Sequence, residues 1–294
     1  MEFNSDKFEC LHYTPSNTPI HNHIYFADNG LPIEEKDSLR DLGVTMSNDG
    51  TFSLYIREKA ARMKSKIAWV LRTFKTRDKL PMITLWKQLI LSDHDYCSQL
   101  WSPNVKGDIQ LLELLQRSYL RKIRSLQGLS YWEQLRKLNM YSLERRRERY
   151  ITIHMWRILE GSAPNISSSN GITGQWNPRR GRTCKVPPVA SSASHRIQTI
   201  RYASFAIKGP RIFNSLPMDL RNFTGGTVNE FKSKLDRHLR LVPDEPLIPG
   251  YTAFRTIDSN SLIDWHSHLS LPRRENSIDI SCQWNTLVDV PGSP

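Results

Sequence analysis

The chain has 294 residues and a net charge of +12, with 41 Lys and Arg against 29 Asp and Glu, 38% hydrophobic residues and four cysteines. No apolar run approaches the roughly 18 residues that span a bilayer, and no charged and apolar leader opens the chain, so we expect neither a membrane protein nor a secreted one. The cysteines are far apart and lack metal-ligand spacing. This argues against a disulfide framework or a structural zinc site and favours an intracellular location, in the nucleus or the cytoplasm.

The positive charge is concentrated in the middle of the chain. Residues 51–240 carry a net charge of +22, whereas residues 1–50 carry −6 and residues 241–294 carry −4. A basic block of this size indicates a surface that binds a polyanion, with nucleic acid as the first candidate. By charge alone, a solvated surface without a polyanion partner explains the pattern equally well.

The first 50 residues predict short strands. Loose alternation favours strands over Phe8–Tyr13, His23–Ala27 and Leu39–Met46, and Asn29-Gly30 predicts a hairpin tip. The run Phe26-Ala27-Asp28-Asn29 is similar to the aromatic-x-Asp-Asp hairpin that holds polymerase metals. Because Asn29 cannot supply the second negative charge, we favour a plain hairpin tip there.

From residue 51 the apolar period becomes helical. Over residues 52–75 eight apolar side chains fall within an arc of about 100°, which predicts one amphipathic helix. They are Phe52, Ile56, Ala60, Met63, Ile67, Val70, Leu71 and Phe74. The remaining faces of that helix are basic. They carry Arg57, Arg62, Lys64, Lys66, Arg72 and Lys75.

Further helices complete a predicted bundle over residues 51–160. They are expected from Pro81 onward, from an N-cap at Asp108, from a Ser130/Glu133 capping box, and over Leu143–Leu159, where Gly161 ends the last of them. The helix after Asp108 would carry Arg117, Arg121 and Arg124 on one stripe. The last helix carries a cluster of basic residues that includes Arg145, Arg146 and Arg149.

The rest of the chain predicts a linker, a small unit and a tail. Residues 161–195 are rich in Ser, Gly and Pro, which predicts a basic linker that carries Arg180 and Arg182. Thr227 and Glu230 cap one helix of a small unit over residues 196–254, and residues 255–294 are expected to be mostly disordered. The predicted fold class is therefore α+β and mainly α, with an antiparallel strand unit, a helical bundle and a smaller carboxy-terminal helix-and-loop unit.

Catalytic patterns are sparse. No Gly-rich phosphate loop, GxSxG elbow or HExxH motif is present, and we predict no catalytic residue, metal site or cofactor in this chain. Asp93-His94-Asp95 is the densest acidic spot, but it offers only two carboxylates to a two-metal site. We favour a helix-end loop there over a metal-dependent nuclease. The pairs His21-x-His23 and His266-x-His268 are predicted to be solvent-exposed rather than metal ligands.

Four tryptophans could either stack on unpaired bases or pack in a core. They are Trp86, Trp101, Trp132 and Trp156. Because they lie among leucines at helical spacing, core packing is the favoured interpretation.

The order of several motifs resembles the reverse transcriptases of non-LTR retrotransposons of the jockey type. The resemblance covers residues 7–264. Its motifs include Arg40-Asp41-Leu42-Gly43-Val44, Trp69-Val70-Leu71-Arg72-Thr73-Phe74, Tyr96-Cys97-Ser98-Gln99-Leu100-Trp101-Ser102-Pro103, Tyr131-Trp132-Glu133-Gln134-Leu135 and Phe213-Asn214-Ser215-Leu216-Pro217.

The resemblance implies the carboxy-terminal part of such an enzyme. Residues 1–50 would hold the last palm strands and a primer-grip hairpin at Leu42 and Gly43, and residues 51–160 would form the thumb. The metal-binding aspartates, and the magnesium that the parent enzyme needs, would belong to a preceding part of the polymerase with which this chain would associate. Asp28 lies too close to Leu42 to be one of those aspartates.

The implied function is binding of an RNA and DNA template-primer through its phosphates, without catalysis by this chain alone. The predicted phosphate-binding residues are Arg57, Arg62, Lys64, Lys66, Arg72, Lys75, Arg117, Arg121, Arg124, Arg145, Arg146, Arg149, Arg180 and Arg182. Other hypotheses are an interaction module that contacts an acidic protein, a metal-dependent nuclease that uses the residues 93–95, and a non-functional relic.

Overall fold

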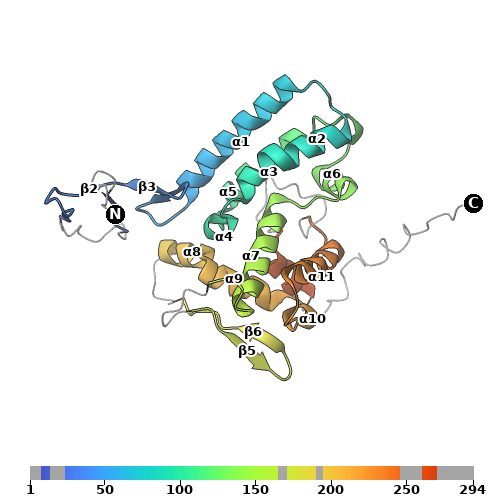
Figure 1. Cartoon of the computed structure of the whole chain (residues 1–294). Coiled ribbons are helices and arrows are strands. Elements are labelled where there is room, and N and C mark those ends of the chain that lie inside the picture. Colours follow the sequence, from blue (N-terminus) through green and yellow to red (C-terminus); the bar gives the residue numbers. More distant parts are fainter. Residues whose placement is uncertain (1–7, 14–23, 165–170, 190–194, 246–259, 270–294) are drawn as a thin grey trace, which may run out of the picture.

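The computed structural model describes residues 8–13, 24–164, 171–189, 195–245 and 260–269. Within these ranges the protein is mainly helical with three small two-stranded sheets, which confirms the predicted α+β class (Figure 1). None of the described helices is both long and apolar enough to cross a membrane. The pair His21-x-His23 and most of the predicted tail lie outside the described residues.

The amino-terminal residues form short strands and a hairpin. Strand β1 (Glu9–Cys10) pairs in parallel with β2 (Glu34–Glu35), and Phe26 forms an antiparallel bridge to Pro32. The intervening turn is closed by the Gly30 N–H, which donates to the Ala27 carbonyl at 2.8 Å. The plain hairpin tip predicted at Asn29-Gly30 is thus confirmed.

The alternation predicted one strand over Leu39–Met46, but the structure has a hairpin there, as the resemblance implied at Leu42 and Gly43. Strands β3 (Ser38–Asp41) and β4 (Val44–Ser47) pair antiparallel on either side of Leu42 and Gly43. These two residues have φ angles of 46° and 83°, the left-handed backbone that a type I′ turn requires. A two-residue turn does not interrupt the alternation of apolar and polar residues from one strand to the next. The alternation over Leu39–Met46 therefore could not distinguish a hairpin from a single strand.

Helix α1 (Ser53–Thr73) confirms the amphipathic helix predicted over residues 52–75. Ile56, Met63 and Val70 lie on its buried face, which packs against α5 (Lys106–Leu120) and a π-helical turn, η2 (Trp86–Ile90). It runs along one edge of the molecule, so that its opposite face is turned away from the other helices (Figure 1).

Several shorter elements follow α1. They are α2 (Lys79–Leu85), η2, α3 (Leu91–Asp95), α4 (Ser98–Trp101), α5, the 3₁₀ turn η3 (Arg124–Leu126) and α6 (Tyr131–Leu138). The helix predicted from Pro81 begins at Lys79, two residues earlier. Helix α5 begins after Val105 rather than after the predicted cap Asp108, whose carboxylate accepts a hydrogen bond from the Ser53 hydroxyl at 2.6 Å.

The capping signals of α6 and α7 (Leu143–Leu159) are confirmed. Ser130 and Glu133 form the predicted capping box, with the Glu133 N–H donating to Ser130 Oγ at 3.3 Å. Helix α7 has the predicted bounds, and Ser142 Oγ caps its first turn by accepting from the Arg145 N–H at 3.1 Å. Gly161, with φ at 70°, follows its last turn.

The region predicted as a linker contains a folded hairpin. Strands β5 (Gly174–Asn177) and β6 (Gly181–Cys184) pair antiparallel, and β6 packs against α9 (Phe205–Ser215) and α10 (Met218–Arg221). The Asn214 amide fixes β6 by bonding both the N–H and the carbonyl of Cys184, at 2.7 and 2.8 Å. Every residue of β5 is exposed, so the sequence of this strand needs no apolar residues and is typical of a loop. Its backbone is nevertheless paired with β6.

The remaining helices are α8 (His195–Ala203), α11 (Val228–Leu241) and α12 (Leu262–Leu269). The predicted Thr227/Glu230 capping box opens α11. Helix α12 lies in the region predicted to be disordered, yet it packs on α9 and its Leu262 is fully buried. His266, predicted to be exposed, lies 3.2 Å from both His238 Nε2 and Ser215 Oγ, and burial, with the charges of His238 and Arg145, lowers its pKa to about 4.

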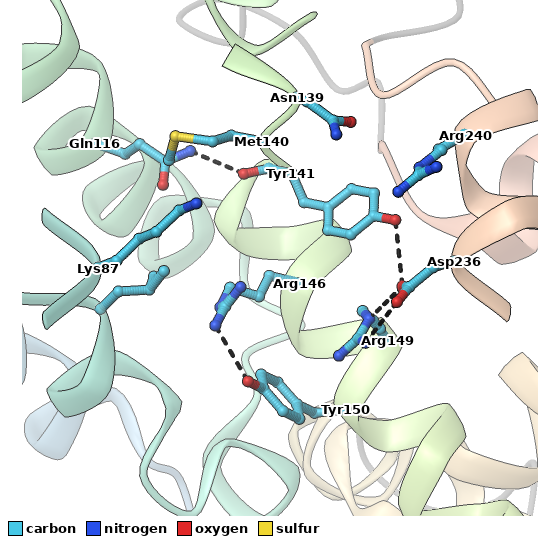
Figure 2. A pocket seen from close by; sticks show the side chains of 11 residues that line it. Lys87, Gln116, Asn139, Met140, Tyr141, Arg146, Arg149, Tyr150, Asp236 and Arg240 are labelled. Carbon is cyan, nitrogen blue, oxygen red and sulfur yellow. Dashed lines mark hydrogen bonds and ion pairs between the residues drawn. The ribbon is translucent and has the colours of Figure 1, made fainter. Parts of the chain in front are cut away.

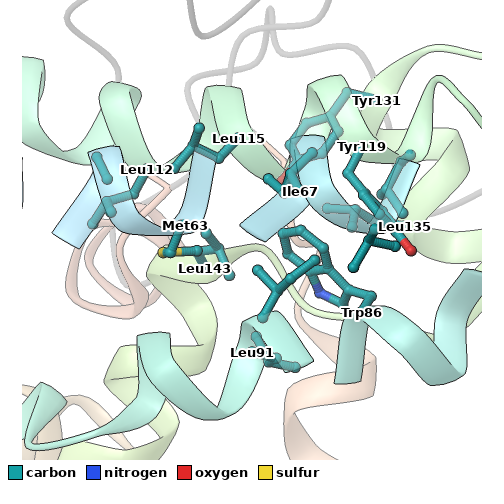
Figure 3. Close-up of a cluster of buried hydrophobic side chains, with 14 of the residues drawn as sticks. Met63, Ile67, Trp86, Leu91, Leu112, Leu115, Tyr119, Tyr131, Leu135 and Leu143 are labelled. Atoms are coloured by element: carbon teal, nitrogen blue, oxygen red, sulfur yellow. The ribbon is translucent and has the colours of Figure 1, made fainter. Parts of the chain in front are cut away.

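Two hydrophobic cores hold these elements together. The first core gathers buried side chains between Val44 and Leu143, with Trp86 and Tyr119 at its centre (Figure 3). The second core gathers those between Ile151 and Leu262. The seam between the cores lies inside α7, whose first turn belongs to the first core and whose second half belongs to the second. The sequence suggests a division at residue 160 instead, at the end of this helix.

Candidate nucleic-acid interface

The outward face of α1 carries exposed basic side chains. Arg57, Lys64 and Arg72 are exposed on the helix, and Lys75 is exposed just beyond its end. None of these four forms an ion pair with a carboxylate in the described part of the chain. They are therefore cations whose charge is not neutralised locally, above a helix face that is anchored in the first core.

The spacing of these cations suits a polyanion. At 100° per residue, the helical positions 57, 64 and 72 fall within about 80° of one another, which makes a single row. At 1.5 Å rise per residue this row is about 22 Å long. A DNA strand presents one phosphate roughly every 3.4 Å along its axis, so the row can follow roughly six base pairs.

A second group of cations on α1 lies close to Asp93 and consists of Lys59, Arg62 and Lys66. Lys66 Nζ lies 3.0 Å from the Asp93 carboxylate, and the buried Lys59 donates to the Asp93 carbonyl at 2.5 Å. Burial works to raise the pKa of Asp93, but the hydrogen bond from Lys66 and the charges of Lys59 and Arg62 outweigh it and lower that pKa. Arg62 also lies 4.0 Å from Glu58, so Lys66 and Arg62 are less open to phosphates than the outer row.

The Asp93-His94-Asp95 run has no open metal geometry. His94 is completely buried, and Asp95 is held by the Arg146 guanidinium at 2.6 Å. Among the described residues there is no group of three or more His, Cys, Asp or Glu that could hold a metal ion. The two carboxylates lie in the short helix α3, where they pair with cations of α1 and α7.

The three arginines predicted to form one stripe on α5 differ in exposure and in position relative to the helix. Arg117 is half-buried with its guanidinium 5.7 Å from the centre of the Tyr131 ring, and Arg121 is exposed at the end of the helix. Arg124 lies beyond the helix in η3, exposed and 3.7 Å from Asp78. The one-stripe prediction is wrong because α5 ends at Leu120, but Arg121 and Arg124 still face solvent.

The arginines of α7 have structural partners, which corrects their predicted role. Arg145 is 0% exposed and donates to the backbone carbonyls of Pro243 and Asn260, each at 3.2 Å. Arg146 is bidentate to Asp95, and Arg149 is bidentate to Asp236 at 2.5 and 2.8 Å. A guanidinium held in this way joins helices, and Arg145 in particular cannot reach a phosphate in this fold.

Buried carboxylates accompany these arginines along the seam. Glu113 accepts from the Tyr131 hydroxyl at 2.6 Å and from the Glu144 N–H at 2.7 Å, and Glu148 accepts from the Ser261 hydroxyl at 2.6 Å. Burial, with the nearby charge of Glu148, raises the pKa of Glu144 to about 8. Arg145, Arg147 and Glu148 of α7 are thus part of the interior, which the prediction of exposed arginines did not anticipate.

The two hairpins differ in what they expose. At the β5–β6 turn Arg180 is exposed, whereas Arg182 donates to the Glu160 carboxylate at 2.5 Å and to the Leu159 carbonyl at 2.7 Å. At the β3–β4 turn Leu42 is 81% exposed, and its carbonyl accepts a hydrogen bond from the Tyr96 hydroxyl at 2.7 Å. The residues suggested for a primer grip therefore form an exposed hairpin tip that is hydrogen-bonded to Tyr96.

The tryptophans are placed as the core interpretation predicted. Trp86, Trp101 and Trp156 are 0%, 1% and 1% exposed, and Trp132 packs half-buried against the first core. The ring of Trp156 stacks on Phe231 with their centres 4.9 Å apart. None of these four rings is presented to solvent as a platform for bases.

Sequence reasoning missed a basic pocket that crosses the seam. Lys87 of η2 and Arg240 of α11 line a cavity of about 240 Å³ together with residues of α5 and α7 (Figure 2). The two residues are far apart in the chain and share no motif. The only signal in the sequence was the general excess of basic residues.

Comparisons with protein-family models, with curated proteins and with solved structures find no match to this chain.

Proposed function

We propose that this protein binds the phosphate backbone of a nucleic-acid duplex through the outward face of α1. The observation that carries the proposal is the row formed by Arg57, Lys64 and Arg72, continued by Lys75, with no carboxylate partner in the described part of the chain. Contacts to phosphates give affinity without sequence preference, so we expect RNA–DNA and DNA duplexes to bind regardless of their sequence.

The motif order that resembles non-LTR reverse transcriptases suggests the biological setting. A polymerase thumb needs a helix with cations outside and apolar residues inside, and α1 meets that requirement. We propose that the chain is the primer-grip, thumb and post-thumb portion of an RNA-directed DNA polymerase, which holds the template-primer. On its own, with magnesium, it is expected to give no primer extension.

The test is the salt dependence of binding to a labelled RNA–DNA duplex. With four phosphate contacts the logarithmic slope is about −3.6, so affinity falls roughly 100-fold from about 50 to about 200 mM salt. In the triple variant Lys64→Ala, Arg72→Ala, Lys75→Ala the slope should shrink in magnitude by about 2.7.

A matched control removes the same charge elsewhere. Lys185, Lys234 and Arg237 are exposed and lie away from α1, so their triple alanine variant should keep the slope of the unmodified protein. An equal loss in both variants would mean that net charge, and not the α1 row, determines binding. Binding that does not respond to salt would contradict the proposal, and retention of an acidic protein instead of duplex would favour an interaction module.

A further inference from the structure

The pocket at the seam is built from both halves of the molecule. Lys87 and Gln116 come from the first-core side, Arg146 and Arg149 from α7, and Arg240 from α11 (Figure 2). Leu91, Met140, Tyr141 and Tyr150 add apolar and aromatic surface. A concave site between two packed units, with a few polar groups over apolar walls, is a common setting for ligand binding.

Charge in the pocket favours an anion. Asp236 neutralises Arg149 and Asp95 neutralises Arg146. Lys87 and Arg240 are exposed and form no ion pair within the described ranges, so two positive charges are left over. Figure 2 shows these two side chains approaching the cavity from opposite walls.

A buried acceptor in the same pocket also lacks a partner. Gln116 is 1% exposed, and its Nε2 donates to the Tyr131 hydroxyl and to the Tyr141 carbonyl, each at 3.0 Å. Because a carbonyl can only accept, the orientation of this amide is fixed. Its Oε1 has no hydrogen-bond partner, and an unpaired buried acceptor is costly.

We infer that this pocket binds a nucleotide, with its phosphate between Lys87 and Arg240 and a sugar hydroxyl donating to Gln116 Oε1. Phosphate satisfies the two cations, the hydroxyl satisfies the acceptor, and the apolar and aromatic walls suit the rest of the nucleoside. The nucleotide is either free in solution or the 5′-terminal residue of an RNA strand. The site uses none of the residues of the α1 row, so its test is independent of duplex binding.

The experiment titrates the full chain with adenosine 5′-monophosphate by calorimetry. We expect saturable binding, at least roughly tenfold weaker binding of adenosine, and about threefold to tenfold weaker binding of the 2′,3′-dideoxy monophosphate. The double variant Lys87→Ala, Arg240→Ala should lose at least roughly tenfold in affinity. The variant Lys64→Ala, Arg72→Ala is the matched control and should bind the nucleotide as the unmodified protein does, while its duplex binding weakens.

Three results would overturn the assignment: no binding of the monophosphate to the unmodified chain, equal binding by the pocket variant, or displacement by inorganic phosphate at the same concentration as the nucleotide. An RNA octamer that carries either a 5′-phosphate or a 5′-hydroxyl decides whether the pocket binds a free nucleotide or the 5′-terminal residue of a strand. A preference for the phosphorylated octamer that disappears in the pocket variant assigns a strand terminus. Equal binding of both octamers, with the monophosphate still saturating, assigns a free nucleotide.

Discussion

His94 is a buried neutral imidazole whose proton can be located from its neighbours. Its Nε2 lies 3.0 Å from Nη1 of Arg147, which can only donate, so Nε2 must accept. Its Nδ1 therefore carries the proton and donates to Asp95 at 3.2 Å. Burial is the main cause that lowers the pKa of His94 to about 4, and the charges of Arg147 and Lys59 act in the same direction against Asp95.

This arrangement makes stability depend on pH. Because the pKa of His94 is about 4 in the folded state and near 6.5 when unfolded, the unfolded chain binds the proton first as the pH falls. His94 should therefore reduce the free energy of unfolding by about 2 kcal/mol between about pH 7 and about pH 5. Urea unfolding at both pH values measures the loss.

The variant His94→Gln isolates this contribution. A glutamine can accept from Arg147 and donate to Asp95 without titrating. The free energy of unfolding of this variant should therefore fall by about 2 kcal/mol less over the same pH interval than that of the unmodified protein. The titration of His266 is common to both proteins and cancels in the difference. Identical pH dependence in the two proteins would show that His94 is not held neutral.

Among the secondary-structure elements, the β5–β6 hairpin depends on one glycine. Gly181 has φ at 68°, and a Cβ built there would lie 2.4 Å from Asn222 Oδ1 and 2.8 Å from Met218 Cγ. The same Asn222 oxygen accepts from the Arg182 N–H at 2.8 Å. Backbone conformation and close packing of β6 on α10 thus both require glycine.

Gly225 provides a matched comparison. It has almost the same φ, 69°, but a Cβ there meets nothing within 4 Å. Gly225→Ala should cost about 1–2 kcal/mol of unfolding free energy from the left-handed backbone alone. Gly181→Ala should cost about 1–3 kcal/mol more, because it adds the collision. Equal losses in thermal or urea unfolding would mean that β6 can move away from α10 without penalty.

Across the whole molecule, α7 makes the two cores interdependent. It contributes Leu143 to the first core and Ile151, Met155 and Trp156 to the second. Arg145, Arg147 and Glu148 of α7 are buried at the seam. Separating the halves would take Arg147 from its hydrogen-bond partner His94, or Glu148 from Ser261. Each lost hydrogen bond to a charged group costs about 1.5–3 kcal/mol.

We therefore expect the two cores to unfold together. Native-state hydrogen exchange in increasing urea should give the same free energy of opening for the most protected amides of α1 and of α11. A clearly lower free energy for α11 would show that the second core opens alone. That outcome would favour the division at residue 160 that the sequence suggests.

Local patterns were reliable where the chain itself supplies the interaction. The apolar arc of α1, the capping boxes at Ser130 and Thr227 and the bounds of α7 are set by residues within a few positions of one another. The apolar alternation over Leu39–Met46 did not indicate the turn at Leu42 and Gly43, which only the family resemblance implied, and the β5–β6 hairpin was missed. Neither turn changes the local hydrophobic pattern in a way that distinguishes it.

A mainly helical α+β chain with a basic middle and candidate cations on α1 follows from the amino-acid order alone, because helix periodicity and net charge are local properties. Which of those cations face solvent depends on tertiary packing. The row from Arg57 to Lys75 stays open, whereas Arg145 and Arg146 of α7 bond to groups far along the chain. Such long-range pairs form only when the helices pack together, and no local pattern encodes them.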